Sequence, residues 1–178
     1  MKALVTGGAA SGKSAFAERL ACQLSDRRIY LATMASRGRE AQARIRRHRS
    51  QRAGLGFATV ECAGSVPSAL CGQTADDVVL LDDLGNLVAQ ALFDEQGTMA
   101  NPSAVLHRLE RELCALADAH AHVVLVGNEV GSSGPSPYPT TNDWIRLMGT
   151  LNCRMAARFD MVVEVACGCP NVLKGDLP

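Results

Sequence analysis

Residues 3–14 read Ala-Leu-Val-Thr-Gly-Gly-Ala-Ala-Ser-Gly-Lys-Ser, and this stretch decides the fold. After the apolar run it matches the pattern G-x-x-x-x-G-K-[ST], in the position between a strand and a helix where that pattern has physical meaning. Glycines allow successive backbone N–H groups to turn toward a phosphate, and the start of the following helix adds a partial positive charge. Lys13 supplies a charge for the β- and γ-phosphates, and Ser14 a hydroxyl for Mg²⁺. The pattern predicts a nucleoside triphosphate site formed by Gly7, Gly8, Ala9, Ala10, Ser11, Gly12, Lys13 and Ser14.

Length and composition point to one soluble domain covering residues 1–178. The chain has 178 residues, enough to bury a proper core, and 18 Lys+Arg balance 18 Asp+Glu. This balance gives no global charge for binding nucleic acid or a membrane surface. No apolar run approaches the ~20 residues that a membrane span needs, and the first strand begins too early for a signal peptide. We therefore expect a cytoplasmic protein with no membrane span.

Seven cysteines are scattered along the chain without paired C-x-x-C spacing. Free thiols in a reducing compartment are the favoured interpretation. Only Cys167 and Cys169 are close in sequence, and a metal or redox role for this pair stays open as the alternative.

Short apolar segments alternate with helical patterns along the whole chain. This alternation predicts an α/β fold with a mainly parallel sheet and helices on both faces. Two of the apolar segments, at 78–81 and 123–126, lack polar residues, as central parallel strands do. The expected strands are 3–6, 28–32, 58–61, 78–81, 123–126 and 161–165, and the expected helices are 14–24, 38–52, 84–93, 102–120 and 143–158. We expect a loop at 131–141, because it holds three prolines, and a short strand or irregular tail at 168–178.

Asp82 and Asp83 follow the apolar run Val78–Leu81. In P-loop proteins an acidic residue at the end of such a strand holds Mg²⁺, directly or through water. We assign this role to Asp82, together with Ser14. Asp83 is interpreted as the cap of the following helix.

An arginine-rich segment, 37–52, contains seven arginines and His48. A solvated basic helix is the common meaning of such a run, and contact with nucleic acid finds no support in basic residues elsewhere or in the aromatic content. A histidine among arginines can also attack the α-phosphorus of a nucleotide, while the arginines neutralise phosphate charge. His48 is thus a candidate nucleophile.

Polar residues follow several other predicted strands. Thr33 ends one strand, Glu61 another, and Asn128-Glu129 a third. The carboxyl ends of parallel strands meet at one edge of a sheet, where ligands bind. We expect these residues to share an edge with the P-loop.

Taken together, these motifs resemble the bifunctional adenosylcobinamide kinase / adenosylcobinamide-phosphate guanylyltransferase family. The resemblance covers nearly the whole chain, and its specific strings are Tyr30-Leu31-Ala32-Thr33, Arg44-Ile45-x-x-His48-Arg49 and Asn128-Glu129-Val130-Gly131.

The resemblance implies a RecA-like P-loop domain that assembles as a homotrimer. Its implied activities are phosphorylation of adenosylcobinamide and transfer of GMP from GTP to the product. His48, as the residue that carries the GMP, and Lys13 are the implied catalytic residues. Mg²⁺ is the implied cofactor, and GTP or ATP the implied nucleotide substrate. Small molecules, a corrinoid and a nucleoside triphosphate, are then the expected partners, with no nucleic acid. Further nucleotide contacts are implied for Ala32, Thr33, Met34, Arg49, Ser50, Gln51, Arg52, Glu61 and Asp82.

Two other functions remain open at this stage. One is a P-loop kinase of another small metabolite, in which His48 is structural. The other is a nucleotide-binding regulatory module that uses the arginine-rich segment to hold nucleic acid or an acidic protein.

Overall fold

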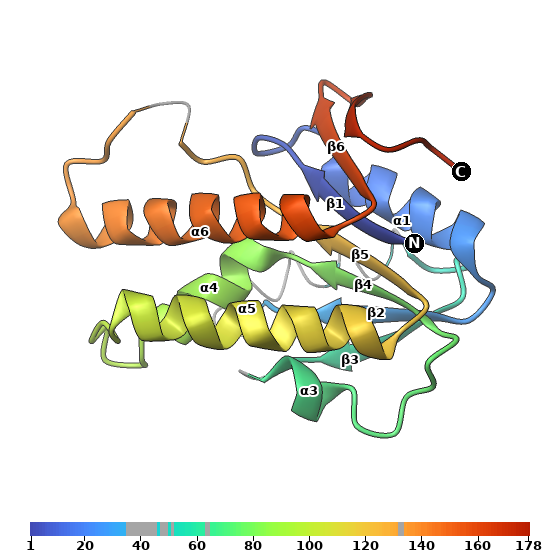
Figure 1. Ribbon diagram of the computed structural model, residues 1–178, viewed down its shortest axis with the longest axis horizontal. Helices are drawn as coiled ribbons and strands as arrows, with labels where there is room; N and C mark the ends of the chain where they lie inside the picture. Colours follow the sequence, from blue (N-terminus) through green and yellow to red (C-terminus); the bar gives the residue numbers. More distant parts are fainter. Residues whose placement is uncertain (35–45, 47–49, 51, 63–64, 132–133) are drawn as a thin grey trace.

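The computed structural model describes residues 1–34, 46, 50, 52–62, 65–131 and 134–178. Its centre is one sheet of seven strands in the order β3-β2-β4-β5-β1-β6-β7 (Figure 1). The strands are β1 (Lys2–Thr6), β2 (Arg28–Ala32), β3 (Phe57–Glu61), β4 (Val78–Asp82), β5 (His122–Val126), β6 (Met161–Ala166) and β7 (Cys169–Lys174).

The first six strands run parallel, and β7 pairs antiparallel with β6 at the edge. The predicted parallel sheet is therefore confirmed. The middle of the sheet is shielded from solvent, because β4 is buried along its whole length and four of the five residues of β5 are buried. Of the two alternatives for residues 168–178, the short strand is correct.

Helices cover both faces, as predicted. They are α1 (Lys13–Leu24), α3 (Val66–Ala69), α4 (Leu84–Leu92), α5 (Pro102–Ala119) and α6 (Pro139–Arg158). Alternate residues of each strand point to opposite faces, and they sort into two apolar clusters. One cluster joins the sheet to α1, and the other joins it to α3, α4, α5 and α6 (Figure 1).

The structure corrects the predicted boundaries at two places. Helix α6 begins at Pro139, inside the segment predicted as a loop, because proline fits the first turn of a helix, where its missing N–H has no partner to lose. The four-residue helix α3 was not predicted, since one turn is too short to show periodicity. Most of the predicted helix 38–52 lies outside the described residues, although Arg46 and Ser50 are helical.

The seven cysteines are free thiols in the structure, and the described residues contain no group of three or more His, Cys, Asp or Glu side chains arranged to hold a metal ion. Cys167 and Cys169 are both exposed. Among the helices in the described ranges, none has the length and apolar character that crossing a membrane requires.

Candidate nucleotide site at the carboxyl edge of the sheet

The predicted P-loop connects β1 to α1 at the carboxyl edge of the sheet. Gly12 caps α1 in the left-handed region, with a φ of 94°. At Gly7 a Cβ atom would lie 2.4 Å from the backbone oxygen of Val165, so no larger residue fits there without a backbone shift. The loop is thus packed directly against the sheet, which holds its backbone in place.

Two backbone hydrogen bonds brace the P-loop from neighbouring segments. The N–H of Glu129 donates to the Gly7 oxygen at 3.0 Å, and the N–H of Gly168, in the β6–β7 turn, donates to the Ser11 oxygen at 2.8 Å. The loop is therefore supported by two segments, the one that follows β5 and the β6–β7 turn. Such rigid backbone support is what a phosphate cradle needs, because donors fixed before binding require no reorganisation.

The side chains of Lys13, Ser14 and Asp82, which the sequence predicts to bind Mg²⁺ and triphosphate, have hydrogen-bond partners at this edge. The ammonium of Lys13 donates to the backbone oxygen of Gly8 at 3.0 Å and so lies against the loop. The Ser14 hydroxyl donates to Oδ1 of Asp82 at 3.4 Å. A hydroxyl and a carboxylate are oxygen ligands of the kind that Mg²⁺ prefers. The predicted pairing of Ser14 with Asp82 thus agrees with the geometry of the structure.

Asp83 has a different role from Asp82. Its Oδ1 accepts hydrogen bonds from the backbone N–H of Asn86 at 2.8 Å and from Nδ2 of the same residue at 2.9 Å. It is the N-cap of α4. The sequence-based distinction between the two neighbouring acids is confirmed for Asp83.

Tyr30 binds the second oxygen of Asp82. Its hydroxyl donates to Oδ2 at 2.9 Å, and both side chains are buried. Burial, and next the negative charge of Asp82, raise the pKa of Tyr30 far above its usual value. The phenol therefore stays protonated and keeps Asp82 oriented toward Ser14.

The strand ends bring further predicted residues to this edge. Ala32, the last residue of β2, lies between Glu61 of β3 and Asp82 of β4 in the sheet register. Thr33 follows Ala32 and is fully buried, and its hydroxyl donates to the Asp83 backbone oxygen at 2.7 Å. Met34 comes next and is partly exposed. The structure thus brings Ala32, Thr33 and Glu61 to the edge that carries Asp82. The Thr33 hydroxyl is already hydrogen-bonded to the backbone of Asp83.

The Asn-Glu pair after β5 is tied to α6. The Asn152 side chain donates from Nδ2 to the backbone oxygen of Asn128 at 3.2 Å. Glu129 accepts from the backbone N–H of Gly131 at 2.9 Å. Asn128 and Asn152 each have a buried Oδ1 that accepts no hydrogen bond from the described part of the chain.

The arginine-rich segment is described only in part. His48, Arg49 and Gln51 lie outside the described residues, so their predicted roles stay predictions. Ser50 is exposed, whereas Arg52 is only 6% exposed. The Arg52 guanidinium lies over the Tyr30 ring, with 3.3 Å between Cζ and the ring centroid.

Two residues of this region, Glu18 and Tyr30, were not predicted as site residues from the sequence. Glu18 lies on the buried side of α1, with Oε1 3.7 Å from Nη1 of Arg52. Tyr30 belongs to the string Tyr30-Leu31-Ala32-Thr33 that carries the family resemblance, but it is not among the predicted site residues. The one available signal was an acidic residue between Ala17 and Ala21 on the apolar side of α1, because a glutamate is seldom buried without a partner.

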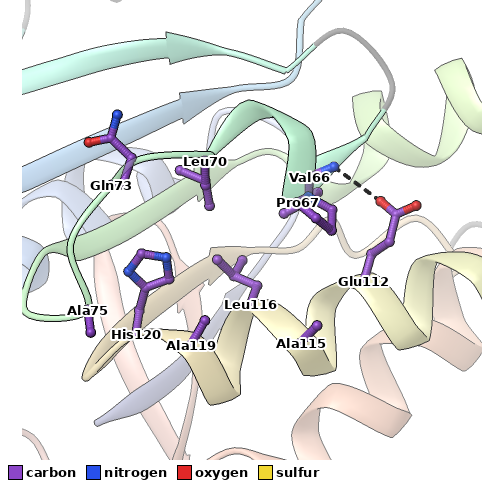
Figure 2. Close-up of a pocket in the computed structure, with 10 residues that line it drawn as sticks. All are labelled: Val66, Pro67, Leu70, Gln73, Ala75, Glu112, Ala115, Leu116, Ala119 and His120. Carbon is purple, nitrogen blue, oxygen red and sulfur yellow. Dashed lines mark hydrogen bonds between the residues drawn. The ribbon is translucent and has the colours of Figure 1, made fainter.

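A separate hollow lies away from these residues, between α3 and α5 (Figure 2). Its volume is about 330 Å³, and its walls are mainly apolar, including Val66, Leu70 and Leu116. Glu112 accepts from the backbone N–H of Val66 at 3.1 Å at one end, and His120 lies at the other (Figure 2). None of the predicted site residues lines this hollow.

Comparison with known proteins places these features in a family. A family model described as cobinamide kinase / cobinamide phosphate guanyltransferase matches residues 3–173. The chain belongs to this family. The match spans the P-loop, Asp82 and the arginine-rich segment, so it includes every site residue predicted above.

Curated relatives agree with the family match over nearly the full length. The "Bifunctional adenosylcobalamin biosynthesis protein CobU" of Salmonella typhimurium is 31% identical over 177 residues, covering 94% of this chain and 97% of the relative. The protein of the same name from Escherichia coli is 32% identical with the same coverage. The "Bifunctional adenosylcobalamin biosynthesis protein CobP" of Pseudomonas aeruginosa is 28% identical, covering 99% of both chains.

Proposed function

We propose that this chain phosphorylates adenosylcobinamide and then transfers GMP from GTP to the resulting phosphate, in adenosylcobalamin biosynthesis. The single observation that carries the proposal is the family match over residues 3–173. The geometry of Lys13, Ser14 and Asp82 agrees with it, because both reactions need a triphosphate held at a P-loop. The substrates are small molecules: a corrinoid, and GTP or ATP.

In the kinase step, the substrate hydroxyl oxygen forms a bond to the γ-phosphorus of the triphosphate. The bond between that phosphorus and the β–γ bridging oxygen breaks, the nucleoside diphosphate leaves, and the hydroxyl proton is released. Backbone N–H groups of residues 7–14 hold the phosphates, and Lys13 compensates the charge on the β- and γ-phosphates. The brace from Glu129 and Gly168 keeps these donors in place.

The donor set at this edge fits Mg²⁺. Ser14 and Asp82 offer a hydroxyl and a carboxylate oxygen 3.4 Å apart at the start of α1, and such hard oxygen ligands together with substrate phosphates form the usual Mg²⁺ site. When bound, the ion supplies charge neutralisation on the phosphates. Tyr30 holds Asp82 in the orientation that faces this position.

In the guanylyl transfer step, we propose His48 as the nucleophile. A ring nitrogen of its neutral imidazole forms a bond to the α-phosphorus of GTP, the α–β phosphoanhydride bond breaks, and pyrophosphate leaves. An oxygen of adenosylcobinamide phosphate then displaces the histidine and takes the GMP. A neutral imidazole nitrogen carries the lone pair that this attack needs, and an ordinary histidine, with a reference pKa of about 6.5, is largely neutral at pH 7.

Further nucleotide contacts are proposed on the strand-edge residues and the arginine-rich segment. Ala32, Thr33, Met34 and Glu61 lie beside Asp82 at the carboxyl edge. Arg49, Ser50, Gln51 and Arg52 follow His48 in sequence. The homotrimer implied by the resemblance is likewise a proposal, and light scattering coupled to size-exclusion chromatography measures it directly.

The test of the histidine step is a covalent labelling experiment. The purified protein is incubated with GTP labelled at the α-phosphate, denatured and washed. We expect retained label that is lost in acid and stable in base, as a phosphoramidate is. His48→Ala removes the label, whereas the matched change His107→Ala, at an exposed position of α5, preserves it. An acid-labile adduct on the His48→Ala protein contradicts the assignment of the nucleophile.

A further inference from the structure

The hollow between α3 and α5 is separate from the phosphate-binding edge, and the proposed reactions do not use it (Figure 2). Its volume is about 330 Å³. Pockets for small molecules begin at about 300 Å³, and an apolar cavity of about 150 Å³ holds a benzene molecule. The hollow is therefore large enough for a molecule with two fused rings.

The walls of the hollow are apolar side chains that also belong to the core. Val66, Leu70 and Leu116 line it, and all three are buried members of the apolar cluster on this face of the sheet. Their packing into the core holds them in place, so they are not free to move into the hollow and fill it. Walls of this kind favour a ligand with an apolar body, because binding removes apolar surface from water.

Hydrogen bonds fix the hollow at both ends. At one end the backbone N–H of Val66 donates to the Glu112 carboxylate at 3.1 Å and so joins α3 to α5 (Figure 2). At the other end the N–H of Ala121 donates to the Ala75 oxygen at 2.8 Å and joins the end of α5 to the segment after α3. The hollow is thus formed before any ligand arrives, as small-molecule sites usually are.

The charge of Glu112 is already compensated. Its Oε1 accepts from Nη1 of Arg108 at 3.2 Å, and its Oε2 accepts from the Val66 N–H. Among the described residues that line the hollow, no other is an Asp, Glu, Lys or Arg. Because a charged group pays a large desolvation cost in apolar surroundings without a partner, the hollow favours an uncharged ligand.

His120 provides a hydrogen-bonding group inside the hollow. It is only 7% exposed, and its Nδ1 lies 3.1 Å from the Thr74 carbonyl oxygen. A carbonyl only accepts, so Nδ1 carries a hydrogen, and in the neutral ring Nε2 keeps its lone pair. Figure 2 shows this second nitrogen directed toward the hollow, and it makes no hydrogen bond to the described part of the chain. An acceptor in such a position favours a ligand with an O–H or N–H donor, because leaving the acceptor unpaired costs free energy.

We propose that the hollow between α3 and α5 binds a small uncharged molecule with a mainly apolar body of two rings and one O–H or N–H group, which donates to Nε2 of His120. None of the residues assigned to the kinase or guanylyl transfer step lines this hollow. The inference therefore does not rest on the proposed function, and its failure leaves that function untouched.

The test titrates the ¹⁵N-labelled protein with indole, a two-ring probe with one N–H donor. We expect saturable shifts of the amide resonances of Val66, Leu70 and Leu116, with a Kd at or below about 1 mM for so small a ligand. N-methylindole, which lacks the donor, binds at least about 5-fold more weakly, because it leaves Nε2 of His120 unpaired. The steric control is 3-methylindole, which keeps the N–H and adds a methyl group of the same size, and it binds within about 3-fold of indole.

Two variants locate the binding. Ala115→Trp adds a large side chain to the wall of the hollow, and Ala104→Trp, its matched control, adds the same side chain to an exposed position of α5 outside the hollow. We expect the first to weaken indole binding at least about 10-fold and the second to leave it unchanged. His120→Phe keeps a ring but removes Nε2, so indole and N-methylindole bind to it with similar affinity. Tm is recorded for each variant, and the ligand comparison on the unmodified protein needs no variant to fold.

Several results overturn the inference. The unmodified protein shows no saturable shifts with indole, or it binds indole and N-methylindole equally well. Indole binds a folded Ala115→Trp protein as strongly as it binds the Ala104→Trp control. A change of oligomeric state in Ala115→Trp, measured by light scattering, also contradicts it, because the hollow is then a contact between copies of this chain.

Discussion

Asp82 and Asp83 are adjacent buried acids, but they have different hydrogen-bond partners, so we expect different effects when each is substituted. Asp82→Asn keeps an acceptor for the Tyr30 hydroxyl and a polar group beside Ser14, so the packing and hydrogen bonds of β4 change little. It removes the negative charge that we propose for Mg²⁺. Asp83→Asn retains the side-chain oxygen that caps α4, and it changes no proposed ligand.

The magnitudes follow from these contacts. Losing an interaction with a charged group costs about 1.5–3 kcal/mol, which at about 1.4 kcal/mol per factor of ten predicts a kinase kcat/KM reduced roughly 10- to 140-fold in Asp82→Asn. Asp83→Asn stays within about 3-fold of the unmodified protein by the same reasoning. Asp83→Ala removes the cap and costs about 1 kcal/mol of stability, or about 2–4 °C in Tm.

The assay measures kinase turnover across a Mg²⁺ titration for both asparagine variants, with Tm recorded by circular dichroism for all three. We expect Asp82→Asn to require more Mg²⁺ and to turn over slowly, with a smaller change of Tm than Asp83→Ala shows. A larger activity loss in Asp83→Asn than in Asp82→Asn refutes the assignment of the metal ligand.

Two further predictions concern the P-loop. Lys13→Ala lowers both reactions by about 2–4 kcal/mol of transition-state stabilisation with the fold intact, because its ammonium meets the triphosphate in either step; near-normal turnover contradicts the phosphate-binding role. Gly7→Ala places a Cβ within 2.4 Å of the Val165 backbone oxygen and so forces the loop to shift. We expect the Kd of a fluorescent GTP analogue to rise at least 10-fold, which corresponds to a loss of about 1.4 kcal/mol of binding free energy. Its control, Gly149→Ala, meets no atom within 4 Å on α6, and binding at control strength by Gly7→Ala shows that the loop tolerates the shift.

Much of the fold followed from local pattern. The P-loop string placed a strand before residue 7 and a helix after it, and the structure has β1 and α1 there. Apolar runs such as Val78–Leu81 predicted central parallel strands because only a strand covered on both faces dispenses with polar residues. The capping role of Asp83 was also predictable from the sequence, since this acid directly precedes a helix.

What local pattern could not predict depends on distant partners. The prolines of 131–141 indicated a loop, yet Pro139 starts α6, because the position of a proline in a helix matters more than its presence. Glu18 and Arg52 are far apart in sequence, and only the folded chain brings their side chains within 3.7 Å of each other. Periodicity identifies the buried side of a helix, but it does not identify which distant side chain compensates a charge placed there.

The central claim is that this one chain carries out both reactions. The most direct measurement incubates the purified protein with Mg²⁺, GTP and adenosylcobinamide and separates the corrinoid products by chromatography and mass spectrometry. We predict that adenosylcobinamide phosphate appears first and that its GMP conjugate accumulates at its expense, with pyrophosphate released in equal amount to the conjugate. Phosphorylated corrinoid without any GMP conjugate, or no modified corrinoid with either GTP or ATP, contradicts the claim.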